Sequence, residues 1–228
     1  MGSNYRMRYG VDLVFCIDAT MSMYPILDTV KRHALNFYQD FIQIMEAKNK
    51  KVQQLRVRIV AFRDYRYDRE KAMMVTDFFN LPEMAQEFEG CIRSIEADGG
   101  GDDPEDGLEA LAYAMKSKWS HDAEKLRHVI VVWSDDATHD LGFGHDAPNY
   151  PKNMAKNFQE LSRWWGSPHA PGVMDEKAKR LLLFTPRFDS WTKITANWNN
   201  VIHHESSAGE GLRDCDYEQI LNAISNTI

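Results

Sequence analysis

Short apolar segments alternate with amphipathic segments along this chain, and this alternation restricts its fold more than any other feature. Between the apolar segments, apolar residues recur at spacings of three and four, which is the period of a helix with one buried face. The apolar segments cover 10–18, 55–62, 128–133, 181–184 and 201–204, with a weaker one at 71–79. The helical period covers 25–48, 82–95, 102–117, 151–165, 191–198 and 217–228.

This order of elements predicts an α/β protein. Strands that alternate with helices form mainly parallel sheets that are covered by helices on both faces. We therefore expect a doubly wound, mainly parallel six-stranded sheet. The 228 residues are enough for one sizeable core, and no repeat or clear linker divides them. We expect a single domain over 10–228, in which the irregular segment 140–172 is an insertion.

Composition excludes several classes of function. The chain has 27 basic and 34 acidic residues and a formal net charge of −7, which argues against a nucleic-acid-binding protein. It contains no run of 18 apolar residues, so we expect no membrane partner. The first ten residues lack the apolar core of a signal peptide, and the three cysteines are odd in number and far apart. These features favour a cytoplasmic location.

Oxygen-bearing side chains follow two of the predicted strands. Asp18, Thr20 and Ser22 come directly after the first strand, and Asp135 follows Trp133. Residues at alternate positions of an extended segment point the same way, and the carboxyl ends of parallel strands meet at one edge of a sheet. Carboxylate, hydroxyl and water oxygens are the ligands that Mg²⁺ prefers. With Asp102, at the start of a predicted helix, these residues indicate a site for a hard divalent cation rather than for zinc.

Two hydroxyl ligands would leave the cation incompletely neutralised and therefore attractive to an incoming carboxylate. This chemistry favours a recognition site with an open coordination position. The simpler interpretation of the same residues is a helix N-cap with incidental hydroxyl groups.

The motif Asp18-Ala-Thr-Met-Ser22 resembles the Asp-x-Ser/Thr-x-Ser signature of von Willebrand factor A domains, which forms their metal-ion-dependent adhesion site. The loop at 99–106 resembles the loop that supplies a further ligand, usually Thr, and 133–136 resembles the strand end that supplies the last Asp. Together with Asp64 and His139, these motifs are closest to the intracellular branch of the family, which includes domains associated with alpha-kinases and bacterial proteins. The resemblance covers 10–228 and implies a Rossmann-like fold.

The resemblance also implies roles for the predicted ligands. Thr20 and Ser22 would bind the cation directly, and Asp18 and Asp135 would bind it directly or through water. Asp102 stands where the family usually has Thr. A carboxylate there would tighten cation binding and weaken the attraction of the cation for an acidic partner. Asp103 is an alternative to Asp102, and Asp136 is an alternative to Asp135.

Two further features of the sequence bear on metal binding. The tract from His139 to Asp146 contains two histidines and two aspartates, which suit a transition metal. Its spacing fixes no other ligand, however, and an exposed loop that carries two histidines is the commoner explanation. Asp64, at the end of the second strand, is expected to face the same crevice as Asp18.

We interpret the chain as a binding module rather than an enzyme. The expected function is divalent-cation-dependent docking of a protein partner. In this docking an acidic residue of the partner would complete the shell of Mg²⁺, Mn²⁺ or Ca²⁺. The alternatives are a metal-dependent phosphohydrolase and a scaffold whose metal is only structural. Phosphohydrolases that begin with a strand-end Asp need a second carboxylate as general acid, and Thr20 occupies that position. The segment 140–172 is expected to lie at the metal face and to determine partner choice.

Overall fold

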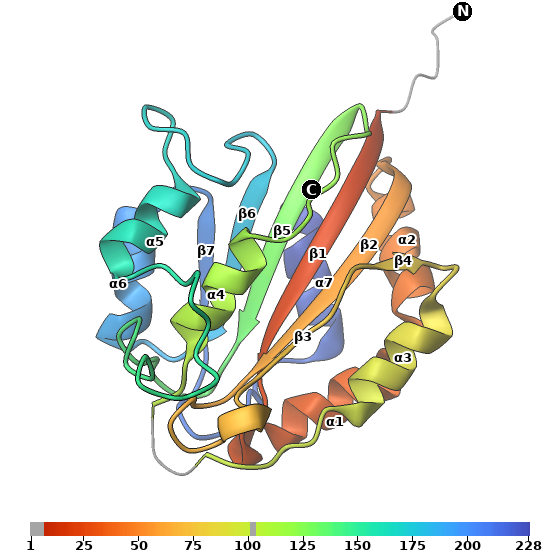
Figure 1. Ribbon diagram of the computed structural model, residues 1–228. Coiled ribbons are helices and arrows are strands. Elements are labelled where there is room, and N and C mark those ends of the chain that lie inside the picture. Colours follow the sequence, from red (N-terminus) through yellow and green to blue (C-terminus); the bar gives the residue numbers. More distant parts are fainter. Residues whose placement is uncertain (1–6, 101–103) are drawn as a thin grey trace, which may run out of the picture.

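The computed structural model describes residues 7–100 and 104–228, and its described strands form one seven-stranded sheet. The order is β3-β2-β1-β5-β6-β7 (Figure 1). Strand β4 also pairs with β2, at residues of β2 that precede those paired with β3. All strands are parallel except β3 and β4, which run antiparallel to β2. The strands are β1 (Arg8–Asp18), β2 (Lys51–Phe62), β3 (Met73–Val75), β4 (Phe79–Leu81), β5 (Lys125–Trp133), β6 (Lys179–Thr185) and β7 (Val201–Glu205).

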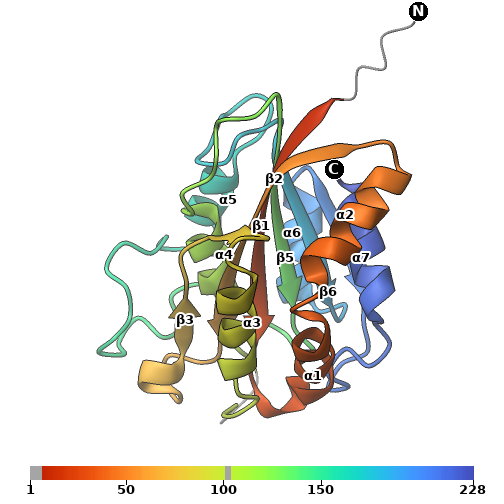
Figure 2. The ribbon, with the colours of Figure 1, turned by 90° about the vertical axis from the view of Figure 1, so that its right-hand side faces the viewer.

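Helices cover both faces of this sheet. One buried cluster joins α1, α2, α3 and α7 to one face, and a second joins α4, α5 and α6 to the other (Figure 2). No described helix is long and apolar enough to cross a membrane. The helices are α1 (Tyr24–His33), α2 (Phe37–Ala47), α3 (Ala85–Ser94), α4 (Gly107–Met115), α5 (Phe158–Trp165), α6 (Asp189–Asn197) and α7 (Tyr217–Asn226), with short 3₁₀ turns η1 (Met21–Met23) and η2 (Arg69–Lys71).

The central strand β1 explains why both layers are needed. Its successive side chains alternate between faces, so Leu13 and Phe15 pack in the first cluster while Val14 and Cys16 pack in the second. Strand β1 is buried from Tyr9 to Asp18. A strand that is apolar on both faces requires cover on both, which confirms the predicted α/β fold class.

Two predicted elements are divided in the structure. The expected helix 25–48 is interrupted between His33 and Phe37, and no Pro or Gly marks the break. The expected strand 71–79 becomes β3 and β4, so the sheet has seven strands rather than six. Between them Thr76 stays paired with Ile59: its amide donates to the Ile59 carbonyl at 3.0 Å, and its hydroxyl accepts a hydrogen bond from the Ile59 amide at 3.0 Å.

Strand order places the predicted ligands at one edge. The chain passes from β1 outward to β2 and then returns to the other side of β1 with β5, so the order reverses between β1 and β5. Ligands of doubly wound sheets bind at the carboxyl ends of the strands beside such a reversal. Asp18 ends β1 and Ser134 follows β5 directly, so both lie at this position.

A buried ion pair links β1 and β2 farther from this edge. The Asp12 carboxylate is fully buried and accepts hydrogen bonds of 2.7 Å from Nε and Nη2 of Arg56, its partner in the β1–β2 register. The Ser120 amide donates to the same carboxylate at 2.7 Å. The bidentate arrangement compensates a charge that burial alone would make very unfavourable.

We expect Arg56→Met to lower the free energy of unfolding by about 3–5 kcal/mol, because it leaves the Asp12 charge buried without its counterion. Urea denaturation measures this loss. The matched control is Arg32→Met, which removes an exposed pair with Asp28 and should cost less than about 1 kcal/mol. Equal losses in the two variants would contradict the assignment.

Candidate metal centre

Asp18 organises the first half of the candidate site. Its buried carboxylate accepts hydrogen bonds at Oδ1 from the Thr20 amide at 3.0 Å and from the Thr20 hydroxyl at 2.6 Å. Its Oδ2 accepts a hydrogen bond from the Ser134 hydroxyl at 2.8 Å. The carboxylate is therefore fixed from both β1 and the segment that follows β5.

Ser22 and Asp135 complete the contact between the two strand ends. The Ser22 hydroxyl donates to Asp135 Oδ1 at 2.9 Å, and it lies 3.4 Å from the Thr20 hydroxyl. The other oxygen of Asp135 accepts a hydrogen bond from the Gly211 amide at 2.8 Å. Four of the five predicted ligands (Asp18, Thr20, Ser22 and Asp135) thus form one continuous set of oxygen contacts.

The alternative ligand Asp136 has a different environment. Its carboxylate accepts a hydrogen bond from the Ala137 amide, and its carbonyl accepts one of 2.7 Å from Trp191 Nε1. The contact with Ser22 is made by Asp135. This geometry favours Asp135 as the ligand at the end of β5.

Gly211 brings the segment before α7 against this site. Its φ of +58° lies in the left-handed region, and a Cβ at this position would lie 2.2 Å from the Ser22 carbonyl oxygen. Glycine is therefore required here by both conformation and space. The close approach allows the Gly211 amide to reach Asp135.

The fifth predicted ligand, Asp102, lies outside the described residues, as does its alternative Asp103. The described residues on either side lie close to the site. Gly100 has a φ of +81°, and a Cβ there would lie 3.3 Å from Thr20 Cβ and 3.5 Å from Glu105 Oε1. The loop therefore passes directly beside Thr20.

Glu105 is an acidic residue of the site that sequence reasoning missed. Its side chain is buried, and neither carboxylate oxygen has a hydrogen-bond partner among the described residues. The signal for Glu105 in the sequence is weak, because an acid near the start of a helix is expected to interact with the helix dipole. The structure instead turns this acid toward the strand ends.

Burial and charge crowding raise the pKa values of the acids at this edge. Burial raises the pKa of Asp18 to about 6, against the effect of its hydrogen bonds from Thr20 and Ser134, and the charge of Asp135 adds to the increase. Burial, followed by the charge of Asp18, raises the pKa of Glu105 to about 10. A nearby cation would oppose both shifts.

We expect the metal-free chain to lose stability as the pH rises, in part because of Glu105. Between its ordinary pKa of 4.5 and its folded value of about 10, the unfolded state releases a proton that the folded state retains. Glu105→Gln should therefore increase the free energy of unfolding at pH 8 by about 1–3 kcal/mol, with little effect at pH 4.5. Urea denaturation in chelator measures this difference, and the exposed Glu83→Gln is the control. A wild-type pH dependence in Glu105→Gln would contradict the expectation.

Comparison with known proteins identifies the fold and the family. Residues 12–126, half of the chain, match the sequence profile described as the von Willebrand factor A domain. No curated protein sequence matches the chain.

Two solved structures of a pilus adhesin share the fold of this chain. The pilus adhesin SpaC from Lactobacillus rhamnosus GG superposes with a TM-score of 0.53 at 12% sequence identity, over 97% of this chain and 31% of the adhesin. Its open conformation gives a TM-score of 0.51 at 12% identity, over 97% and 30%. The vWF domain of the type V pili tip protein Mfa5 from Porphyromonas gingivalis has a TM-score of 0.41 at 17% identity, over 60% and 40%.

The chain spans less than a third of the length of SpaC, and at 12% identity the similarity to SpaC concerns the fold alone. The match of residues 12–126, together with the order of strands and helices, shows that the chain belongs to the von Willebrand factor A domain family.

Proposed function

We propose that this domain binds a protein partner in a manner that depends on a divalent cation. The cation is Mg²⁺ or a similarly hard ion, Mn²⁺ or Ca²⁺, and its ligands are Asp18, Thr20, Ser22 and Asp135. The observation that carries the proposal is the continuous set of oxygen contacts across the ends of β1 and β5. All four side chains offer the hard donor atoms that these ions prefer.

The directions of the hydrogen bonds fit a cation. The Thr20 hydroxyl donates its proton to Asp18, and the Ser22 hydroxyl donates its proton to Asp135. A hydroxyl has one proton and two lone pairs, so donation to a carboxylate leaves its lone pairs available for a metal ion. When bound, the cation would supply positive charge that attracts an acidic group of the partner.

The surface around Ser22 suits a protein partner. Ser22 is exposed, and its neighbours Met21 and Tyr24 are 66% and 65% exposed. Large exposed apolar side chains next to a polar centre are typical of recognition surfaces. They support docking of a macromolecule over hydrolysis of a small phosphate ester, for which Thr20 supplies no acidic group.

Asp102 is proposed as an additional ligand in the position of the usual Thr of the family. Its carboxylate would increase the negative charge around the cation, so it should strengthen cation binding and weaken the attraction for an acidic partner. The nearby approach of Gly100 to Thr20 supports a role for this loop.

A cytoplasmic location also stays a proposal. The three cysteines support it, since Cys16, Cys91 and Cys215 are all free thiols. Free cysteines are common in reducing compartments.

The segment 140–172 is proposed as the element that determines partner choice. Its first part follows β5 at the edge where the strands end (Figure 1). The later part contributes to the core, because Leu161 and Trp165 of α5 are buried. Deletion of the whole segment would therefore damage the fold, and exposed residues of its first part are the better targets.

We expect Ser22→Ala to lower the affinity for Mg²⁺ by at least ~10-fold, because it removes one oxygen and the hydrogen bond that orients Asp135. Isothermal titration of the chelator-treated chain measures this affinity. Ser94→Ala is the control, since Ser94 is an exposed serine at the end of α3. In the same titration, Asp102→Ala should lower the affinity for Mg²⁺ and Asp103→Ala should not, because Asp102 is the proposed ligand of this loop.

The partner test uses the same variants. Capture from native cell extract should require Mg²⁺, and it should be lost in Ser22→Ala but retained in Ser94→Ala. Capture that persists in chelator and in Ser22→Ala would favour a scaffold with a structural metal. Unchanged Mg²⁺ binding by a folded Ser22→Ala chain would overturn the ligand assignment.

We expect Lys152→Glu combined with Lys156→Glu to reduce capture of an acidic partner, because both side chains are exposed in the segment 140–172 and attract negative charge. Mg²⁺ affinity should stay within about twofold of wild type, since neither lysine is a proposed ligand and salt screens exposed charges. The control is Lys51→Glu, an exposed change at the start of β2. Equal capture by the wild type, the double variant and the Lys51→Glu variant would argue against the proposal for this segment.

A further inference from the structure

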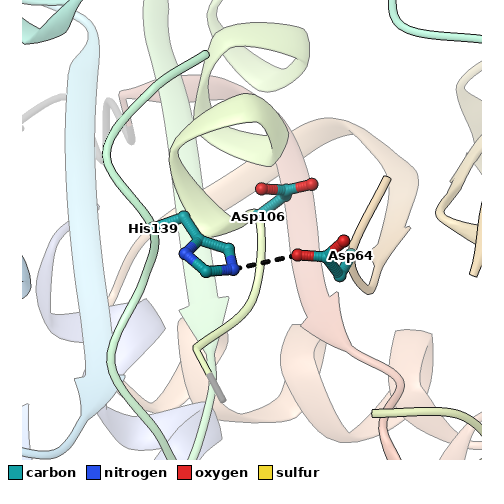
Figure 3. Close-up of side chains that lie close together, drawn as sticks. All are labelled: Asp64, Asp106 and His139. Carbon is teal, nitrogen blue, oxygen red and sulfur yellow. Dashed lines mark ion pairs between the residues drawn. The ribbon is translucent and has the colours of Figure 1, made fainter. Parts of the chain in front are cut away.

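A second group of ligand-type side chains lies outside the oxygen set of Asp18. Asp64, Asp106 and His139 each offer one ligating atom, and these atoms lie within 4.8 Å of one another (Figure 3). The three residues are buried. They come from the end of β2, the N-terminus of α4 and the segment that follows β5.

Backbone hydrogen bonds hold the three segments together. The Asp106 amide donates to the Arg63 carbonyl at 3.2 Å, and the His139 amide donates to the Glu105 carbonyl at 2.9 Å. The His139 ring also stacks on Phe143, with 3.7 Å between the ring centroids. The positions of the three side chains are therefore fixed before any ligand binds.

Each carboxylate has one oxygen that accepts hydrogen bonds and one oxygen that accepts none. Asp64 Oδ1 accepts hydrogen bonds from the amides of Arg66 and Tyr67, and Asp106 Oδ2 accepts one of 2.7 Å from the Tyr65 amide. The opposite oxygens, Asp64 Oδ2 and Asp106 Oδ1, have no hydrogen-bond partner among the described residues. The amides thus orient both carboxylates and leave one oxygen of each for another ligand.

The contact between His139 and Asp64 has an unusual geometry. His139 Nε2 lies 2.9 Å from Asp64 Oδ2, yet neither atom has a hydrogen-bond partner in the described part of the chain (Figure 3). Their short separation therefore lacks the alignment of a donated proton. The contact is an ion pair when the imidazole is protonated. When the imidazole is neutral with Nε2 unprotonated, the two atoms converge as ligands to a shared cation do.

A further acid lies one helical turn along α4. Glu109 is fully buried, and its Oε1 accepts hydrogen bonds from the Gly142 amide at 2.8 Å and the Tyr150 hydroxyl at 2.9 Å. Its Oε2 has no partner among the residues described. Buried carboxylates are normally paired or coordinate metal ions, so this region favours a cation.

We propose that Asp64, Asp106 and His139 form a second metal site, selective for a divalent transition-metal ion such as Zn²⁺. Imidazole nitrogen suits zinc and its neighbours better than it suits Mg²⁺ or Ca²⁺. Zinc bonds of ~2.0–2.1 Å in tetrahedral geometry place ligand atoms about 3.3 Å apart. The separations of 2.9 Å and at most 4.8 Å bracket this value. Three protein ligands leave one position for water.

This site differs from the transition-metal site considered for the tract from His139 to Asp146. His145 is exposed, and its Nδ1 lies 2.8 Å from the Gly142 carbonyl. His139 instead meets two acids that are distant in the sequence. The second site shares no ligand with the Asp18 site, so the two proposals stand or fall separately.

The experiment titrates the chelator-treated full chain with Co²⁺, whose visible absorption reports coordination by nitrogen and oxygen in a four-ligand site. We carry it out in the Ser22→Ala background to suppress the first site. One equivalent of Co²⁺ should bind, and Zn²⁺ but not excess Mg²⁺ should displace it. His139→Gln should weaken binding by at least ~100-fold, whereas the control His145→Gln should match the Ser22→Ala parent.

The second site would be overturned if no Co²⁺ binds that Zn²⁺ can displace. It would also be overturned if a folded His139→Gln chain binds Co²⁺ as tightly as the Ser22→Ala parent. X-ray absorption of the zinc-loaded wild-type chain provides a readout that does not depend on folding of a variant. One imidazole nitrogen with carboxylate oxygens supports the site, and an all-oxygen shell contradicts it. Loss of Mg²⁺ binding with retained Zn²⁺ binding would count against the Asp18 site alone. Loss of Zn²⁺ binding with retained Mg²⁺ binding would count against the second site alone.

Discussion

The structure depends on the burial of many carboxyl groups at one edge of a parallel sheet. Transfer of an uncompensated carboxylate from water into a protein is strongly unfavourable. Hydroxyl groups and backbone amides satisfy part of the set, but several oxygens have no partner among the described residues. Cations are the natural means of balancing the remaining charge. The buried acids at this edge are Asp18, Asp64, Glu105, Asp106, Glu109 and Asp135.

Most of the fold was predictable because β1, β2, β5 and β6 carry long apolar runs that require cover on both faces. The interruption between α1 and α2 was not, since both helices continue the same apolar period and no helix-breaking residue separates them. The division of the edge strand depends on the pairing of Thr76 with Ile59, a contact between segments. The domain limits 10–228 stay a prediction.

The candidate site also has a part that was predictable from the sequence and a part that was not. Asp18, Thr20 and Ser22 were predictable because they are close in sequence, and Asp135 because it closely follows a strongly apolar strand. Glu105 was missed because an acidic residue at this position is already explained by the start of a helix. The contacts among Asp64, Asp106 and His139 depend on backbone pairing between three loops, which the spacing of residues does not encode. Asp102 lies outside the described residues.

The central position of β1 has a consequence for folding kinetics. β1 pairs with β5, more than 100 residues later in the chain, and the bond from Ser22 to Asp135 spans 113 residues. The Gly211 amide joins the same carboxylate from still farther along the chain. Contacts of such sequence separation form only after long loops have closed. During synthesis the Asp18 half of the first site therefore emerges long before its other half, and the complete ligand set can serve as a marker of finished folding rather than as its nucleus.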